Sequence, residues 1–302
     1  MGFTLKGIYS KLRRHTNMTQ VLSLANQKGG VGKTTTSVNL AASLAATKRR
    51  VLLVDLDPQG NATMGVGVDK NSLEKTLCDV LLQGMDPRDC MQHIENVGID
   101  LLPSNSDLTA AEVELMRSSG AETRLKDCLS SIKHDYEFVI LDCPPALNML
   151  TLNAMVASDG VIIPMQCEYY ALEGLTSLID NIEQVRSSVN PNLQIEGLLR
   201  TMYDPRNTLS NDVSSQLVEH FGDKVYRTIV PRNVRLAEAP SYGLPALLYE
   251  KTSRGALAYL ALAGEMLRRD DQYSTASRST EPSAMARSEE RRVGKECRCR
   301  GS

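Results

Sequence analysis

The sequence predicts an α/β fold, namely a doubly wound, mostly parallel sheet with helices on both faces. Across residues 20–269, short apolar runs of strand length alternate with longer stretches whose apolar residues recur at helical spacing. A glycine-rich loop joins the first such run to the first helical stretch. Two later runs end in aspartate, at the edge where doubly wound sheets bind ligands. Since no change of composition interrupts these residues, we expect one domain.

The predicted strands are short runs of aliphatic and β-branched residues, and the predicted helices carry apolar residues three and four positions apart. Strands are expected at residues 19–25, 51–55, 99–103, 138–142, 160–164, 195–201 and 225–230. Helices are expected at residues 33–46, 121–133, 172–189, 211–221 and 253–269. Helical crossovers between parallel strands cover both faces of a sheet, which is the basis of the doubly wound prediction.

The loop between the first strand and the first helix has the composition of a phosphate-binding loop. It comprises Lys28, Gly29, Gly30, Val31, Gly32, Lys33, Thr34 and Thr35. Glycines allow successive backbone N–H groups to converge on one anion, and the helix N-terminus adds partial positive charge. Lys33 is placed near the β- and γ-phosphates, and Thr34 is placed to bind Mg²⁺. A glycine turn that only caps a helix is the alternative, which the flanking strand and helix disfavour.

This loop departs from the usual pattern G-x-x-x-x-G-K-[ST] in one informative place. Gln27 stands where the pattern has its first glycine, and Lys28, which follows it, is an additional lysine. The ordinary pattern has no requirement for this second lysine.

Two acidic motifs follow apolar strands further along the chain. Asp55 and Asp57 belong to the motif DLDPQG, and Asp142 begins the motif DCPP. A carboxylate at the end of an aliphatic strand is costly to bury without a cation or hydrogen-bond donors, so Mg²⁺ is the expected partner of Asp142. Asp57 is interpreted as the residue that orients the attacking water. A helix cap and a turn residue are the simpler interpretations of these two positions.

The composition excludes several classes of protein. At 302 residues the chain is long enough for one large domain with tails. It has no apolar run that would span a bilayer and no signal-peptide core, which predicts a cytoplasmic protein. The seven cysteines show no C-x-x-C spacing, so neither a disulfide framework nor a metal cluster is expected. Aromatic residues are few, so Tyr169 and Tyr170 are interpreted as core residues, with a place in a dimer interface as the alternative.

Charge is distributed unevenly along the chain. Residues 51–199 contain 8 basic and 23 acidic residues, whereas residues 200–269 contain 10 basic and 7 acidic residues. An acidic surface repels nucleic-acid phosphates. Any binding of DNA is therefore expected to use a local patch within 200–269.

The two ends of the chain differ from residues 18–269. Residues 1–17 form a basic N-terminal extension with four Lys and Arg residues and no acidic residue, and Met18 is an alternative start. Residues 270–302 are rich in Ser, Arg and Glu, which predicts a disordered tail. The last part of this tail resembles vector-derived sequence rather than native protein.

Taken in order, the motifs resemble the ParA/Soj family of chromosome- and plasmid-partitioning ATPases, which are P-loop NTPases with a deviant Walker A loop. The resemblance covers residues 18–269. It rests on KGGVGKT from Lys28, DLDPQGN from Asp55, DCPP from Asp142, EYYALEGL from Glu168 and VPRNVRLAEAPS from Val230.

The resemblance implies a role for each matching residue of the loop. Lys28 would reach across an ATP-bound dimer to the partner's phosphates, and Lys33 would be the ordinary phosphate lysine. Thr34 would ligate Mg²⁺, Thr35 would contact the α-phosphate, and Asp57 would position the hydrolytic water. The catalytic residues so implied are Lys28, Lys33 and Asp57.

Other roles implied by the resemblance lie outside the loop. Asp142 would act on Mg²⁺ through water. Pro231 and Asn233 would lie against the adenine. Arg206 and Arg235 would bind DNA without sequence preference, and both belong to the basic segment 200–269. An ordinary surface ion pair is the alternative for each arginine.

As a whole, the resemblance implies a nucleoid-associated homodimer that forms with ATP and Mg²⁺ and binds double-stranded DNA. A ParB/Spo0J-type centromere-binding partner would stimulate its slow ATP hydrolysis. A MinD-like membrane-positioning ATPase is the first alternative, although its C-terminal amphipathic helix has no counterpart after residue 269. The basic residues 1–17 leave a contact with lipid or DNA open. An iron–sulfur relative of the fold is the second alternative and would need paired cysteines.

Overall fold

The computed structural model describes residues 19–169 and 171–279. The predicted extension 1–17, the tail from residue 280 and Tyr170 lie outside the described residues. The chain divides into two compact units, Met1–Ala263 and Gly264–Ser302. The sheet and all the predicted site residues belong to the first unit.

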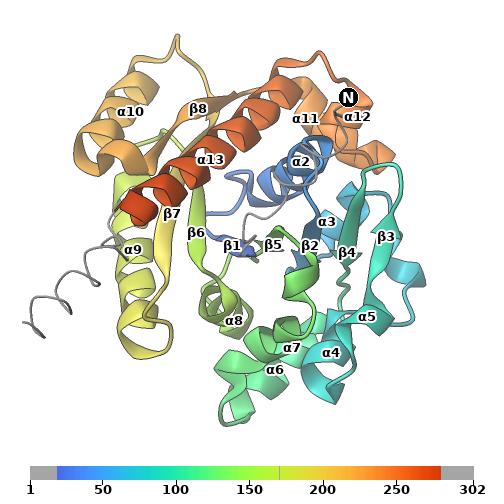
Figure 1. Ribbon diagram of the computed structural model, residues 1–302. Coiled ribbons are helices and arrows are strands. Elements are labelled where there is room, and N and C mark those ends of the chain that lie inside the picture. The colour runs from blue at the N-terminus through green and yellow to red at the C-terminus, as the bar shows by residue number, and fades with distance from the viewer. Residues whose placement is uncertain (1–18, 170, 280–302) are drawn as a thin grey trace, which may run out of the picture. The chain divides into compact units, whose positions relative to one another are not determined.

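Among the described residues, eight strands form one sheet in the order β3-β4-β2-β5-β1-β6-β7-β8 (Figure 1). They are β1 (Gln20–Leu24), β2 (Val51–Asp55), β3 (Gln92–Ile94), β4 (Ile99–Leu102), β5 (Phe138–Asp142), β6 (Gly160–Gln166), β7 (Gln194–Tyr203) and β8 (Val225–Pro231). All neighbouring strands are parallel except β3 and β4, which are antiparallel. The strands after β5 lie on the opposite side of β1 from β2, so the winding reverses beside β1. The predicted doubly wound sheet is confirmed.

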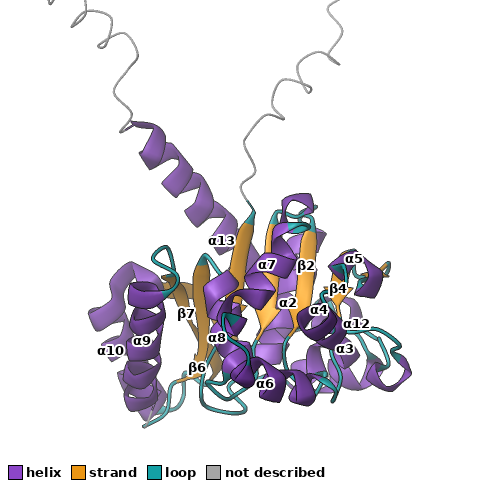
Figure 2. Cartoon of the chain, turned by 90° about the horizontal axis from the view of Figure 1, so that it is seen from below, coloured by secondary structure: helices purple, strands orange, loops and turns teal. Residues whose placement is uncertain are grey.

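Helices cover both faces of this sheet. They are α2 (Lys33–Ala46), α3 (Asn61–Gly65), α4 (Leu77–Gln83), α5 (Pro87–Cys90), α6 (Leu108–Arg117), α7 (Arg124–Ser130), α8 (Met149–Ala157), α9 (Ala171–Ser188), α10 (Thr208–Phe221), α11 (Val234–Glu238), α12 (Ala246–Tyr249) and α13 (Arg254–Ser279). Figure 1 shows α2, α11 and α12 on one side of the row of strands. The helices α4, α6, α7 and α8 lie on the other side and come to the front in Figure 2. No helix in residues 19–169 and 171–279 has the length and apolarity needed to cross a bilayer.

The two strands that precede the acidic motifs are buried along their whole length. Every residue of β2 and of β5 is buried, as parallel strands between two layers of helices require. Asp55 is the last residue of β2 and Asp142 the last residue of β5. The burial of the two strands therefore carries both carboxylates into the interior at one edge of the sheet.

Several elements differ from the sequence-based predictions, which did not include the helices α3, α4, α5, α6, α8, α11 and α12. Instead of one helix over residues 121–133, the structure has α7 between two short 3₁₀ turns. The hydroxyls of Ser130 and Ser131 donate to nearby backbone carbonyls at 2.6 and 3.1 Å, which competes with continuation of the helix. Helix α13 starts as expected but continues to Ser279. The antiparallel strand β3 has three residues, too few to show a periodicity.

Candidate active site

The glycine-rich loop lies between β1 and α2, at the carboxyl edge of the sheet. Gly30 and Gly32 have φ values of +75° and +89°, a left-handed backbone that glycine adopts at little cost. Gly32 is the N-cap of α2 and has no side chain to cap the helix. The first-turn N–H groups of α2 are therefore left for another acceptor. A Cβ added at Gly29 or Gly30 would meet no atom within 4 Å, so the loop has room beside it for a phosphate.

Side chains from three strand ends hold this loop in shape. Asn26, just after β1, donates through Nδ2 to a carbonyl oxygen of β6 at 2.8 Å. Gln166 donates through Nε2 to the Gly30 carbonyl at 3.3 Å, and Thr201 donates through Oγ1 to the Val31 carbonyl at 2.7 Å. Sequence reasoning missed these three residues. The one feature of the sequence that could have identified them is that each is a polar residue near the carboxyl end of an apolar strand.

Lys33 is buried in the loop, with 7% of its surface exposed. Its Nζ donates to the carbonyl oxygens of Asn26, at 2.9 Å, and Lys28, at 3.4 Å. Burial lowers the pKa of Lys33, and the negative charge of Asp142 partly opposes this shift. A cation held among backbone carbonyls can transfer to phosphate oxygens, which carry more negative charge. This position suits the contact predicted for Lys33.

Asp55 and Asp142 lie side by side at the ends of β2 and β5, where they are register partners. Both are fully buried. Asp55 accepts from the N–H and the hydroxyl of Thr63, each at 2.8 Å. Asp142 accepts at Oδ1 from the Ser37 hydroxyl at 2.7 Å. Burial and the repulsion from Asp55 raise the pKa of Asp142 to about 8, and burial raises that of Asp55 to about 6.

The surroundings of Asp142 fit a divalent cation. Its second oxygen, Oδ2, is buried and has no hydrogen-bond partner among the described residues. The Thr34 and Ser37 hydroxyls act on the same carboxylate and lower its pKa. Oxygen donors of this kind are what Mg²⁺ prefers, and a cation would relieve the repulsion between the two aspartates. Ser37, one turn after Thr34 on α2, is a further residue that the sequence motifs did not single out.

Asp57 lies in the turn after β2 and is 8% exposed. Its Oδ1 accepts from the Gln59 N–H at 2.9 Å, and its own N–H donates to Asp55 at 3.1 Å. Its charge acts on the pKa of Lys33 and of Asp142. Asp57 is thus both a turn residue and a neighbour of the buried charges. Its role with water stays a prediction.

Lys28 has a different environment from Lys33. It is half-exposed and forms an ion pair with Glu168, which follows β6, at 2.5 Å. This lysine therefore lies at the outer side of the loop, while Lys33 already supplies a cation within it.

The residues predicted to contact adenine and DNA come from the region after β7. Pro231 ends β8, and Asn233 caps α11 by accepting from the Arg235 N–H at 3.1 Å. Arg206 forms a bidentate pair with Asp204, at 2.9 and 2.8 Å. Arg235 pairs with Glu238 on α11 at 2.7 Å. The adenine and DNA roles stay predictions.

One interpretation of an aromatic residue was wrong. Tyr169 is 74% exposed rather than part of the core. It follows directly after Glu168, which is also exposed. The five cysteines in the described residues are free thiols.

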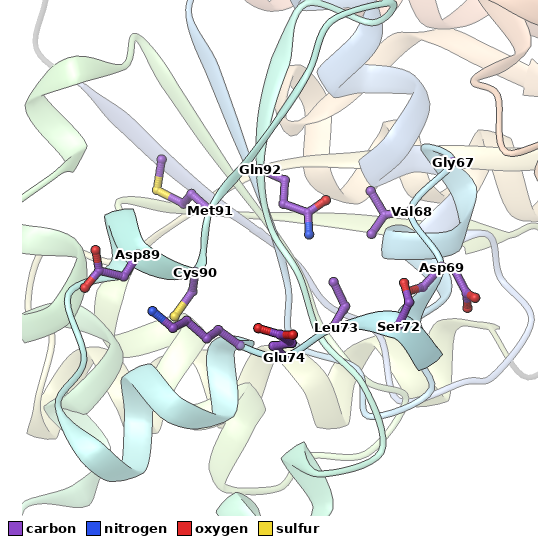
Figure 3. A pocket seen from close by; sticks show the side chains of 11 residues that line it. Gly67, Val68, Asp69, Ser72, Leu73, Glu74, Asp89, Cys90, Met91 and Gln92 are labelled. Atoms are coloured by element: carbon purple, nitrogen blue, oxygen red, sulfur yellow. The ribbon is translucent and has the colours of Figure 1, made fainter.

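A separate hollow of about 510 Å³ lies beside the edge strand β3 (Figure 3). Asp69, Glu74 and Asp89 line it, together with one lysine, Lys75. Because carboxylates outnumber the cation there, this hollow does not suit phosphate groups. The phosphate loop remains the candidate site.

Comparison with known proteins identifies relatives that match most of the chain. The chain matches the family model described as an AAA domain over residues 19–195. It is 63% identical to an uncharacterized protein of Pseudomonas putida, with 87% of this chain and all of that protein covered. It is 50% identical to the chromosome partitioning protein ParA of Caulobacter vibrioides, over 84% of this chain and 96% of that protein. It is 49% identical to the sporulation initiation inhibitor protein Soj of Bacillus subtilis, over 82% and 98%.

Among solved structures, a cobyrinic acid a,c-diamide synthase of Mycobacterium smegmatis, with bound ATP analogue and magnesium, has a TM-score of 0.74. It is 38% identical to this chain and covers 84% of it, while 96% of that structure is matched. The doubly wound sheet, the glycine loop with two lysines and the paired strand-end aspartates thus occur in a chain that matches these relatives over most of its length. The chain belongs to the ParA/Soj family of chromosome-partitioning P-loop ATPases.

Proposed function

We propose that this chain hydrolyses ATP with Mg²⁺ as an ATP-dependent homodimer that binds DNA without sequence preference. With a ParB-type partner that stimulates the slow hydrolysis, the dimer segregates or positions chromosomal or plasmid DNA on the nucleoid. The observation that carries the proposal is the pair of lysines on one loop. Lys33 is buried inside the loop, whereas Lys28 is half-exposed on its outer side. A second cation in that position is useful to a neighbouring subunit rather than to its own site.

The residues of one subunit divide the work of binding and hydrolysis. Backbone N–H groups of the loop and Lys33 hold the phosphates, and Thr35 contacts the α-phosphate. Thr34 and, through water, Asp142 would hold Mg²⁺, which would supply positive charge against the charge that develops on the phosphates. Asp57 orients the water that attacks. Catalysis rests on positioning the reactants and stabilising the charge of the transition state, since the reaction needs no covalent intermediate with the protein.

The remaining roles belong to the part of the chain after β7. Pro231 and Asn233 lie against the adenine and tie β8 and α11 to the nucleotide. Arg206 and Arg235 contact DNA, and both lie in the one basic segment of the domain, 200–269. Both arginines are exposed and paired with single carboxylates in this structure, and phosphate oxygens would replace those carboxylates.

The test is an ATPase assay of the full chain alone, with DNA, with a candidate ParB, and with both. We expect strong stimulation only when DNA and ParB are both present. Hydrolysis that is indifferent to DNA would contradict the partitioning function, and an absence of hydrolysis in all four conditions would contradict the ATPase assignment.

A further inference from the structure

The outer lysine of the loop is not free in this structure. Lys28 Nζ lies 2.5 Å from Glu168 Oε2, and each side chain keeps 49% of its surface exposed. The lysine and the glutamate are separated by 140 positions in the sequence. The contact therefore depends on the fold, which brings the turn after β6 beside the loop after β1.

The backbone that carries Glu168 is held in place. The preceding residue, Cys167, is buried, and its carbonyl accepts from the Ser210 hydroxyl at 3.1 Å. Glu168 itself donates its N–H to the Gln166 carbonyl at 3.0 Å, and its carbonyl accepts from the Ala171 N–H at 3.0 Å. These hydrogen bonds orient the backbone of Glu168, whose carboxylate reaches Lys28.

A second contact joins the same two segments. Gln27, next to Lys28, donates through Nε2 to the Ser177 hydroxyl on α9 at 3.2 Å. Gln27 and Lys28 are therefore both tied to residues of their own subunit, Gln27 to Ser177 and Lys28 to Glu168.

We propose that Glu168 is a latch that holds Lys28 on its own subunit until a nucleotide-bound partner arrives. The inference rests on the proposed function, in which Lys28 serves the phosphates of the partner. Triphosphate oxygens carry more negative charge than one carboxylate, so they displace Glu168 when two loaded subunits meet. Without nucleotide the lysine stays paired in its own subunit, and the nucleotide-free chain has no spare cation to offer at this loop. Glu168 is a positioning residue, because it acts through Lys28.

The first experiment measures dimerisation by analytical ultracentrifugation at saturating ATP and Mg²⁺. An exposed ion pair of this kind changes an equilibrium by about two- to fivefold. Since both subunits must release their lysine, Glu168→Gln is expected to lower the dimer dissociation constant by roughly fourfold to twenty-fivefold. Glu173→Gln is the matched control, because it removes a negative charge from α9 and leaves the Lys28 pair intact. Unchanged or weaker dimerisation of Glu168→Gln would overturn the latch.

The second experiment uses the nucleotide-free monomer, so it does not depend on the proposed function. Competitive labelling of amines with acetic anhydride, read by mass spectrometry, reports how available Lys28 is. Glu168→Gln is expected to raise the labelling of Lys28 about two- to fivefold over that of Lys126, with no change in Glu173→Gln. Equal labelling of Lys28 in all three proteins would overturn the latch. If Glu168→Gln raises the labelling of Lys28 as expected but the wild-type chain does not dimerise with ATP, the result would instead contradict the proposed function.

Discussion

Two lysines of one loop differ in burial, and this difference suits one of them to nucleotide binding and the other to dimerisation and hydrolysis. Lys33 is 7% exposed and donates to carbonyls of its own loop, whereas Lys28 is half-exposed and pairs with a carboxylate outside the loop. A buried cation that exchanges its carbonyl acceptors for phosphate oxygens contributes to nucleotide binding. A half-exposed cation can contribute to the later steps, dimerisation and hydrolysis. Substitutions of the two lysines should therefore have different effects.

Lys28→Ala is expected to reduce hydrolysis under dimer-forming conditions by at least about tenfold, because a charge that stabilises the transition state is lost. Nucleotide binding by the monomer should change little, since Lys33 remains. ATP turnover and the binding of a fluorescent ATP analogue measure the two effects. Lys126→Ala, at an exposed position on α7, serves as control. Hydrolysis by Lys28→Ala at the wild-type rate would contradict the role of this lysine.

The paired aspartates predict how stability depends on pH. Unfolded carboxyls lose their protons near pH 4, whereas the folded Asp55 and Asp142 have pKa values of about 6 and about 8. Between pH 4 and pH 8 the folded state therefore binds more protons than the unfolded state. The free energy of unfolding of the nucleotide- and Mg²⁺-free chain should decrease as pH rises through this window.

Asp142→Asn tests this dependence, because it removes the group with the larger shift. At pH 8 the variant should be more stable than the wild type, by on the order of 2 kcal/mol or more, and at pH 5 the difference should be smaller. Urea unfolding at both pH values measures it. Equal pH dependence of the two proteins would show that the aspartates are not the source. Added Mg²⁺ should stabilise the wild type more than the variant.

At the level of elements, a contact between two glycines joins the segment after α3 to the segment after α11. Gly67 and Gly243 have φ values of +93° and +62°. A Cβ on Gly243 would lie 2.6 Å from the Cα of Gly67, a backbone atom that cannot move aside. Gly67 follows the acidic motif and Gly243 follows the predicted adenine contacts. The contact thus holds two parts of the predicted site at a fixed spacing.

Gly243→Ala is expected to lower the free energy of unfolding by roughly 2–4 kcal/mol, from left-handed strain of about 1 kcal/mol and from the clash. Gly84→Ala is the matched control. Gly84 has a similar φ of +68°, but a Cβ there would meet nothing within 4 Å. Its cost should stay at about 1 kcal/mol. Similar losses in the two variants, measured by urea unfolding, would show that the close approach carries no energy of its own.

For the whole domain, the uneven charge determines where DNA is able to bind. Residues 51–199 hold 23 acidic and 8 basic residues and would repel a phosphate backbone. The segment 200–269 has an excess of basic residues. Binding restricted to this segment should be weak at physiological salt and should depend on dimerisation, which doubles the number of contacts.

The double variant Arg206→Ala/Arg235→Ala is expected to weaken DNA binding at every salt concentration. It should also reduce the slope of log affinity against log salt by about two per subunit. Arg88→Ala is the control, because Arg88 is an exposed arginine that pairs with Asp135 in the acidic part of the chain. Fluorescence anisotropy with random-sequence duplexes in ATP measures both quantities. An unchanged slope would indicate that these arginines only pair with Asp204 and Glu238.

The local parts of this protein followed from the sequence. The strands β2 and β5 and helix α2 have the predicted bounds, because apolar runs and helical spacing are local properties. The order of motifs also predicted the family. Local patterning failed at the end of α7, because it does not show that the Ser130 and Ser131 hydroxyls compete for backbone carbonyls. It also failed at β3, because three residues are too few to show a periodicity.

The sequence by itself therefore determined seven of the strands, the helices with clear apolar spacing, and the identity of the loop and its aspartates, since each depends on neighbouring residues. Only the tertiary structure decided which side chains support them. Ser37 meets Asp142 across 105 positions, Thr201 meets Val31 across 170, and Glu168 meets Lys28 across 140. Parallel strands far apart in the chain end at one edge of the sheet, and no local pattern records which polar residues meet there.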